Sequence, residues 1–464
     1  MNVSDGELMQ GILAAQGFEV VGAPEQADVI LVNTCAIRDH AEQRVIGRVG
    51  ELYRFKRDRP DVVIGVTGCM AQRLGERLLA QAGYVDLVLG PDAYRGLPAA
   101  LDRVRPGILA ATATPSAQAT SASPGLAPRR SLPVLGNDSA NGESGRLALL
   151  EFQGGENYEG LEIRRTSQVS AWVPVQRGCD YRCTYCIVPY VRGPEKNRDP
   201  QHVLAEVRGV AEQGITEVTL LGQTVNSWQH GDWSFARLLR EVARVDGIRR
   251  VRFTSPHPND FTAELAEVMA GEPRVCRQLH LPVQSGSNRT LKRMLRRYTV
   301  EGYLEKVAMV RALAPDIALS TDVIVGFTGE TEADFQATLA LLREVRYDDA
   351  YLYKYSPREG TPATRLPAGE FIDDDVAQAR LLEVIELHRS IQNEINQAAV
   401  GSTEEVLVER TARSAGDVLG RTAGNKVVAF PGDASRIGEY VHVRLTGTTG
   451  ATFRGELAAV AAMP

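Results

Sequence analysis

Apolar and polar residues change their spacing several times along the chain, and these changes divide it into segments. Over residues 5–104, stretches with helical spacing such as "GELMQGILAAQG" alternate with short apolar runs, "ADVILVNTC", "DVVIGVTGC" and "YVDLVLG". This alternation predicts a small βα domain with a parallel sheet over residues 1–105. Such a domain should begin with a strand, whereas this sequence begins with a helical pattern, so we expect its first strand to be missing.

Six apolar runs recur between residue 171 and about residue 356, with helical patterns between them. The runs are "WVPVQ", "EVTLL", "RVRFT", "QLHLPV", "STDVIVG" and "AYLYKY". Successive βα units of this kind favour an open or partial barrel over a flat sheet. A long amphipathic helix over about 374–399 completes the predicted domain, which spans 169–399.

The remaining segments have different compositions. Residues 109–145 are rich in Ala, Ser, Thr, Pro and Gly, so we expect a flexible linker there, inside a connector over 106–168. From residue 401, short runs between turn signals ("EEVLVER", "VLGRT", "KVVAF", "YVHVRL") predict a small antiparallel β-barrel over 400–464. The predicted fold class is therefore α/β, with an N-terminal βα domain, a central partial (βα)6 barrel and a C-terminal β-barrel.

Composition narrows the class of protein. The 464 residues are 44% hydrophobic and 24% charged, with a net charge of -6, which fits a globular protein and argues against general nucleic-acid binding. No apolar run has membrane-spanning length, and the start lacks the features of a signal peptide, so we expect a cytoplasmic protein. Six cysteines are too few for a disulfide scaffold, and their clustering suggests metal or redox chemistry.

Three of the cysteines lie together in "QRGCDYRCTYCIVPYVRG", as Cys179, Cys183 and Cys186. They follow the first predicted barrel strand, and the carboxyl ends of barrel strands form the active-site edge. Three thiolates leave one iron of a four-iron cluster open to a substrate or cofactor. A zinc ribbon would need a second Cys-x-x-Cys pair, which the sequence lacks, and buried structural cysteines rarely cluster so densely.

Cys179, Cys183, Tyr185 and Cys186 resemble the signature of the radical S-adenosylmethionine (SAM) enzymes. Further motifs resemble the tRNA branch of the methylthiotransferases: "LLGQTVNSW", "FTSPHP", "HLPVQSGSNRTLKRMLRRYT", "DVIVGFTGET" and "YKYSPREGTPA". The first domain and the C-terminal tail resemble that family's accessory domain and TRAM-type β-barrel. The resemblance implies that SAM binds the open iron of a 4Fe-4S cluster through its amino and carboxylate groups and yields a 5′-deoxyadenosyl radical.

The resemblance also assigns roles to individual residues. It implies that Gly222 and Gln223 hold the methionine end of SAM and that the backbone of Gly326 contacts the adenine. An alternative for Gly326 is turn chemistry before a helix that Thr331 caps. Gln284, together with the serine that follows it, is expected to contact cofactor or substrate.

Two isolated cysteines, Cys35 and Cys69, each close an apolar strand, and such strand ends share one crevice in a parallel sheet. The resemblance implies that they are two of three ligands of an auxiliary 4Fe-4S cluster implicated in supplying sulfur. The third ligand is expected a few residues before "MNVSDGELM" and is missing from this sequence, so we expect the natural start to lie upstream. The last cysteine, Cys276, fits a core position better than a ligand.

The sequence evidence for RNA binding is weaker than the evidence for the cluster. A helix over "RTLKRMLRR" would present a cationic stripe or merely a solvated face, formed by Arg289, Lys292, Arg293, Arg296 and Arg297. Trp228 and Tyr190 are candidates for stacking on bases or for core packing.

The resemblance implies a monomeric enzyme, without a membrane partner, that adds a methylthio group to C2 of N6-isopentenyladenosine in the tRNA anticodon stem-loop. It would consume two molecules of SAM and need an external electron donor and a sulfur source. The alternatives are a methylthiotransferase acting on a ribosomal-protein aspartate or on threonylcarbamoyl-adenosine tRNA, and a non-catalytic iron–sulfur or zinc RNA-binding module.

Overall fold

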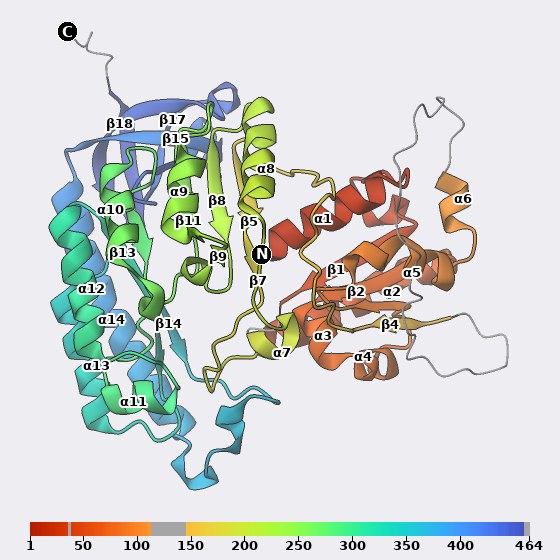
Figure 1. The fold of residues 1–464 in the computed structure, drawn as a ribbon, viewed down its shortest axis with the longest axis horizontal. Helices are drawn as coiled ribbons and strands as arrows, with labels where there is room; N and C mark the ends of the chain where they lie inside the picture. Colours follow the sequence, from red (N-terminus) through yellow and green to blue (C-terminus); the bar gives the residue numbers. More distant parts are fainter. Residues whose placement is uncertain (36–38, 113–144, 459–464) are drawn as a thin grey trace. The chain divides into compact units, whose positions relative to one another are not determined.

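The computed structural model describes residues 1–35, 39–112 and 145–458. The chain forms two compact units (Figure 1). The first comprises Met1–Thr166 and Ile187–Lys196, and the second comprises Ser167–Cys186 and Asn197–Pro464. No helix in the described ranges combines the length and the apolar character that crossing a membrane requires.

A four-stranded parallel sheet organises the first unit, in the order β1-β2-β3-β4. Its strands are β1 (Val29–Thr34), β2 (Val63–Gly68), β3 (Leu87–Leu89) and β4 (Leu147–Leu149). The helices of this unit are α1 (Asn2–Ala14), α2 (Asp39–Asp58), α3 (Cys69–Leu74), α4 (Glu76–Gln81), α5 (Leu97–Val104), α6 (Ile108–Thr112) and α7 (Val188–Arg192). β2 is buried along its whole length, as a central parallel strand should be.

The connector predicted over 106–168 differs from the structure. β4 lies inside it and pairs with β3, and the first unit extends to Thr166. A strand of only three residues carries too little periodicity to be distinguished from a loop. Most of the predicted linker, 113–144, lies outside the described residues.

The second unit contains six parallel strands, all where the sequence predicts them: β5 (Ser170–Pro174), β8 (Glu217–Leu221), β11 (Arg250–Phe253), β12 (Gln278–His280), β13 (Ala318–Val325) and β14 (Asp349–Lys354). They form two sheets, β11-β8-β5 and β12-β13-β14, and a parallel bridge between Val251 and Val275 connects the chain before β12 to β11. The α/β fold class and the partial barrel are confirmed.

Helices cover the outer face of these strands (Figure 1). They are α8 (Pro200–Glu212), α9 (Phe235–Ala243), α10 (Ala263–Gly271), α11 (Asn288–Arg293), α12 (Val300–Leu313), α13 (Glu332–Val345) and α14 (Asp374–Ala399). The predicted long helix is thus confirmed as α14. Trp228 is 1% exposed in the core, where its indole N–H donates to the Arg198 carbonyl, so it does not serve as an RNA-stacking residue.

Five strands close the C-terminal barrel: β15 (Thr403–Thr411), β16 (Asp417–Thr422), β17 (Val427–Pro431), β18 (Tyr440–Thr448) and β19 (Thr452–Leu457). The sequence pattern missed β19, and the barrel is not wholly antiparallel because β17 and β19 pair in parallel. Gly455 interrupts the apolar alternation of β19; a Cβ there would lie 2.3 Å from Val443 Cγ1, which explains the glycine.

Two arginines of β11 join the small barrel to the partial barrel. Arg250 donates to the carbonyls of Arg421 (2.8 Å) and Glu405 (2.7 Å). Arg252 donates to the carbonyls of Thr422 (2.7 Å) and Ala423 (3.0 Å). Both arginines are buried, so these bonds satisfy backbone oxygens that water does not reach.

Candidate functional site

The loop with three cysteines lies beyond the carboxyl end of β5. Cys179 and Cys183 are buried and Cys186 is half-buried, and none of the described cysteines forms a disulfide. The backbone N–H of Cys186 donates to the carbonyl of Cys183 (3.0 Å), which closes a tight turn. Two donors reach the sulfurs: Arg296 Nη1 lies 3.3 Å from Cys183 Sγ, and Thr224 Oγ1 lies 3.8 Å from Cys179 Sγ.

Neighbouring segments hold this loop in place. The Gln176 side chain accepts from the backbone N–H of Thr224 (2.9 Å) and donates to Ser227 Oγ (3.0 Å), both beyond β8. The backbone N–H of Thr184 donates to the Met294 carbonyl (3.0 Å), beyond α11. The loop is therefore fixed from two sides at the carboxyl edge of the strands.

His257 packs against this loop. Its ring stacks on Tyr181, with 3.9 Å between centroids, and Tyr181 in turn donates to Asp260. Burial and the charge of Arg296 lower the pKa of His257 to about 2, so the ring is neutral at pH 7. Because Nδ1 accepts from the Asn259 N–H, Nε2 carries the proton; it is buried and has no partner among the described residues. This segment carries the family motif "FTSPHP". Nothing in the sequence indicated that the His257 ring lies at the cysteine loop.

The described residues contain no group of three His, Cys, Asp or Glu side chains that converges on one metal ion. This argues against a preformed mononuclear zinc site in those ranges. A four-iron cluster is less demanding, since each thiolate binds a different iron and the sulfurs need not meet at one point. The loop, with two buried cysteines, one half-buried cysteine and donors at two sulfurs, fits such a cluster.

Two predicted cofactor residues follow β8. A Cβ on Gly222 would lie 2.8 Å from Gln176 Oε1, so the close packing of the loop requires glycine there. Gln223 Oε1 is buried and accepts no hydrogen bond in the described structure. A buried acceptor without a donor costs about 1–3 kcal/mol, which suits a position where a ligand supplies the donor.

The other predicted cofactor residues lie beyond β12 and β13. Gln284 is buried with φ +69, a conformation that is costly for a residue other than glycine and that concentrates at functional sites. Ser285 faces the core, beside Thr338 Oγ1, which speaks against a ligand contact. Gly326 has φ +70, and a Cβ there would lie 2.6 Å from Ala377 Cβ, so turn geometry and packing explain this glycine. Thr331 caps the following helix as predicted, and Asp334 completes a capping box that was not predicted.

In the first unit, Cys35 directly follows β1 and Cys69 directly follows β2. Both lie at the carboxyl edge of the sheet, since Thr34 pairs in register with Gly68. Arg192 is buried beside Cys69, with Nε 3.2 Å from Sγ, and its Nη2 lies 2.5 Å from an Asp5 carboxylate oxygen. Cys276, in the second unit, is buried, and burial raises the pKa of its thiol, as expected for a core cysteine.

The basic run 289–297 is not one cationic stripe. α11 ends at Arg293, whose guanidinium pairs with Glu370, while Arg289 pairs with Asp334. Arg296 turns inward to Cys183. Of the five cations, therefore, only Lys292 and Arg297 remain exposed without an ion pair in the described structure.

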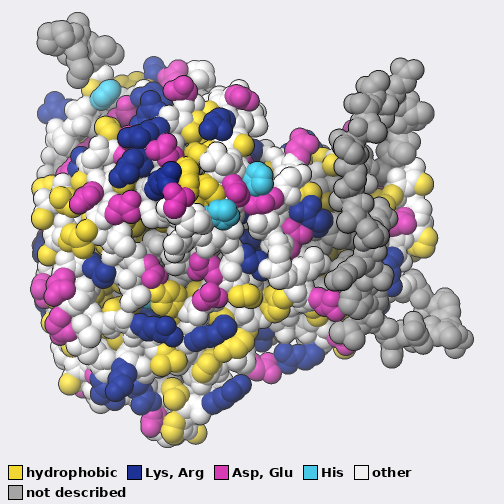
Figure 2. Space-filling view, in the orientation of Figure 1, with side chains coloured by type: hydrophobic (Ala, Val, Ile, Leu, Met, Phe, Trp, Pro, Cys, Tyr) yellow, Lys and Arg dark blue, Asp and Glu magenta, His cyan; other side chains and the backbone are white. Residues whose placement is uncertain are grey.

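Lys292 and Arg297 line a hollow of about 490 Å³ together with Arg182 from the cysteine loop. Its other lining residues are uncharged except Arg296, and none of those described is acidic. Lys and Arg side chains are prominent around α11 in the lower part of Figure 2. This hollow is the cationic surface that the sequence run only partly indicated.

The interior of the partial barrel contains a cavity of about 640 Å³. Aromatic side chains line it beside polar ones: Trp172, Phe253, Tyr351, Tyr353, Gln278, His280, Ser320 and Asp322. His280 lies between Ser320 Oγ (3.1 Å from Nδ1) and Asp322 Oδ2 (3.4 Å from Nε2). Arg421 and Glu409 of the C-terminal barrel also line this cavity.

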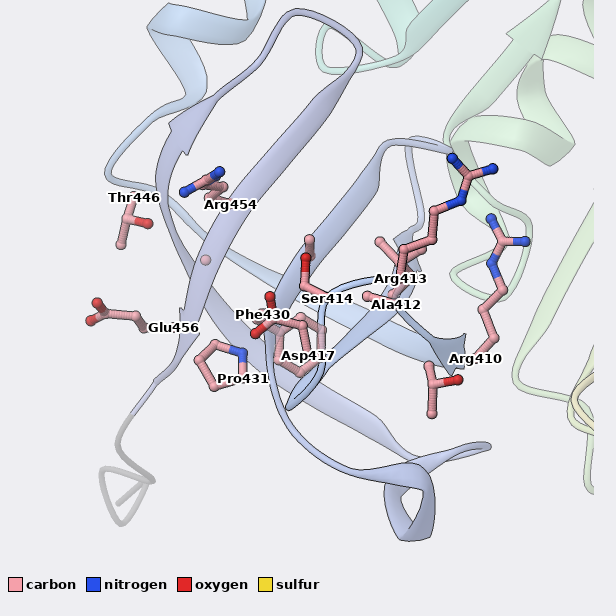
Figure 3. A pocket seen from close by; sticks show the side chains of 14 residues that line it. Arg410, Ala412, Arg413, Ser414, Asp417, Phe430, Pro431, Thr446, Arg454 and Glu456 are labelled. Carbon is pink, nitrogen blue, oxygen red and sulfur yellow. The ribbon is translucent and has the colours of Figure 1, made fainter.

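A second cavity, of about 870 Å³, lies on the C-terminal barrel (Figure 3). Arg410, Arg413 and Arg454 line it and are exposed. Figure 3 shows that the Arg410 and Arg413 side chains extend in the same direction from the end of β15. Asp417 and Glu456 also line the cavity, so its charge is mixed.

Three family models match the chain. They are the radical SAM superfamily over residues 173–342, the uncharacterized protein family UPF0004 over 1–90 and the TRAM domain over 397–458. The structure is similar to the radical SAM methyltransferase TsrM from Kitasatospora setae, with a TM-score of 0.56 at 14% identity over 84% of this chain and 86% of that chain. At that identity the likeness concerns the fold alone.

Close relatives share nearly the whole length. The chain is 41% identical to the tRNA-2-methylthio-N(6)-dimethylallyladenosine synthase of Chloroherpeton thalassium, over 98% of this chain and 93% of that protein. It is 42% identical to the synthase of the same name from Phocaeicola vulgatus, again over 98% and 93%. The chain therefore belongs to the tRNA-2-methylthio-N(6)-dimethylallyladenosine synthase family of radical SAM enzymes.

Proposed function

We propose that this protein is a radical SAM methylthiotransferase that replaces the hydrogen at C2 of N6-isopentenyladenosine in tRNA with a methylthio group. The observation that supports this proposal best is the three-cysteine loop at the carboxyl edge of the partial barrel, with Cys179 and Cys183 buried and Cys186 half-buried. The chain that carries it is about 41% identical to such synthases over nearly its full length. When bound, the cluster supplies the electron that cleaves the sulfonium of SAM.

Cys179, Cys183 and Cys186 would hold three irons and leave the fourth open to SAM. Gln223 supports this site, since its unpartnered Oε1 would accept from the ammonium group of SAM. Gln284 and the backbone of Gly326 lie on following loops of the same edge, where they would contact the rest of the cofactor. The protein's contribution is to orient SAM and to exclude water from the radical.

The barrel cavity is the proposed site of the target base. Its volume of about 640 Å³ is in the range of small-ligand pockets, and aromatic side chains beside polar ones suit a purine with an apolar substituent. The cationic hollow near the cysteine loop and the arginines of the C-terminal barrel would bind phosphates of the tRNA anticodon stem-loop.

Cys35 and Cys69 are proposed ligands of a second cluster that supplies the sulfur. Two thiolates leave two irons of a four-iron cluster without protein ligands, so the described residues fit only part of it. We further propose an external electron donor and sulfur source, a monomeric protein and a cytoplasmic location, where thiols remain reduced.

Reconstitution with iron and sulfide under anaerobic conditions tests the proposal. The protein should become brown, release 5′-deoxyadenosine from SAM and a reductant, and bind tRNA. Mass analysis of tRNA nucleosides from cells lacking the protein should reveal N6-isopentenyladenosine without its methylthio group. A colourless zinc protein, or an unchanged nucleoside profile, would contradict the proposal. A methylthio group found on a ribosomal protein would instead indicate the alternative activity on a ribosomal-protein aspartate.

A further inference from the structure

Arg296 belongs to the basic run 289–297, but its side chain points inward and contacts the cysteine loop. The preceding Leu295 has φ +54, which is costly for leucine, and its side chain is 51% exposed. This turn at the end of α11 sends Arg296 inward and leaves Arg297 exposed. The turn is a helix C-cap, in which the Arg296 N–H donates to the Leu291 carbonyl (2.9 Å) and the Leu295 N–H donates to the Lys292 carbonyl (3.1 Å). What distinguishes Arg296 is therefore the group that its guanidinium contacts.

Three bonds fix the guanidinium at the loop. Nη1 lies 3.3 Å from Cys183 Sγ, Nε donates to Tyr298 Oη (3.0 Å), and Nη2 donates to the Pro282 carbonyl (3.3 Å). Tyr298 is itself held, because its hydroxyl donates to the Val283 carbonyl (2.9 Å). The cation is thus supported by the chain beyond β12 and cannot easily turn away from the sulfur.

A fixed cation at this place affects the electron transfer that the proposed function requires. Reduction adds one electron, and hence one negative charge, to a cluster whose thiolate ligands are already negative. A charge-assisted N–H···S bond therefore stabilises the reduced state more than the oxidised state and raises the reduction potential.

We propose that Arg296 is a positioning residue of the radical cluster: through the Cys183 thiolate it raises the potential at which the cluster accepts one electron from an external reductant. This inference rests on the proposed function, because it assumes a cluster on the three cysteines. It also changes how the basic run should be tested, since a variant that neutralises Arg296 would impair SAM cleavage as well as any tRNA contact.

The test uses the full chain, reconstituted anaerobically, as wild type, Arg296→Gln, Arg296→Lys and, as control, Arg343→Gln, an exposed change on α13. Iron content is measured first, then the midpoint potential by a redox titration followed by electron paramagnetic resonance. Arg296→Gln should hold about four irons on the three cysteines. Its potential should fall enough to lower the reduced-to-oxidised ratio about tenfold, or about 59 mV for one electron.

SAM cleavage provides an independent readout. With dithionite, Arg296→Gln should form 5′-deoxyadenosine about tenfold more slowly, and titanium(III) citrate, a stronger reductant, should restore most of the rate. Arg296→Lys and Arg343→Gln should stay close to wild type in potential. If Arg296→Gln loses its cluster, the comparison rests on Arg296→Lys. A wild-type midpoint potential in that variant supports the role of a positive charge at position 296.

An unchanged potential in Arg296→Gln, or an equal fall in Arg296→Lys, would overturn the inference. A wild-type protein that holds a cluster but cleaves no SAM would instead contradict the proposed function, while the comparison of potentials would still decide the role of Arg296.

Discussion

Replacing Arg380 with methionine should destabilise the second unit by leaving a buried carboxylate without its partner. Arg380 Nη1 lies 2.9 Å from Glu330 Oε2, and the two side chains are 9% and 0% exposed. The same oxygen accepts from the Gly326 N–H (2.6 Å), so the pair ties α14 to the loop after β13. Breaking one partner of a buried pair costs about 3–5 kcal/mol. For a unit of this size that is a loss of thermal midpoint on the order of 10 °C.

The loss should depend on pH. Burial raises the pKa of Glu330 above its ordinary value of 4.5, against the opposing effects of the Gly326 N–H and Arg380, so removing Arg380 raises it further. The native carboxyl then binds more protons than the unfolded one, and stability falls as pH rises from about 4.5 through the raised value. Arg380→Met should therefore lose less stability at pH 5 than at pH 8.

Tryptophan fluorescence is a selective assay, because Trp172, Trp228 and Trp233 all lie in the second unit. Arg389→Met, an exposed change on the same helix, is the control. Adding Glu330→Gln to Arg380→Met removes the buried charge and should recover part of the loss. The reasoning fails if Arg380→Met costs no more than Arg389→Met, or costs the same at both pH values.

Three further outcomes are expected. Replacing Cys179, Cys183 or Cys186 with Ala should abolish both the iron of the radical cluster and 5′-deoxyadenosine formation; unchanged cleavage in any of them would refute the ligand assignment. Changing Arg182, Lys292 and Arg297 to Gln together should weaken tRNA binding and flatten the slope of log affinity against log salt by about 2–3, at about 0.9 per phosphate contact. SAM cleavage without tRNA should persist, and a loss no greater than that of Arg208→Gln with Arg343→Gln and Arg389→Gln would mean an ordinary solvated face. A tRNA that lacks the isopentenyl group should turn over slowly in a product assay, whereas equal turnover would indicate another branch of the family.

The local sequence pattern predicted the six strands of the partial barrel and the cysteine loop, because each of these depends on a short continuous stretch of sequence. The direction of a charged side chain is not local: Arg289 and Arg293 turn toward Asp334 and Glu370, which lie 45 and 77 residues further along the chain. β19 escaped prediction since Gly455 interrupts its apolar alternation. His257 could not be recognised as a buried neutral donor, because its pKa depends on burial and on the distant Arg296.

The joint between the two barrels has a consequence for engineering and divergence. Arg250 and Arg252 donate hydrogen bonds to carbonyl oxygens of β16 and of the residue after it. A backbone carbonyl accepts such a bond whatever side chain its residue carries. The outward residues of that strand can therefore be exchanged without loosening the attachment, provided that the backbone keeps its path. Arg250 also donates to the Glu405 carboxylate (3.1 Å) and lies over the Tyr440 ring, so a C-terminal barrel grafted from a relative with other RNA preferences should dock through the same two arginines if it keeps these two residues. Such a graft should bring a new substrate range to an unchanged catalytic half.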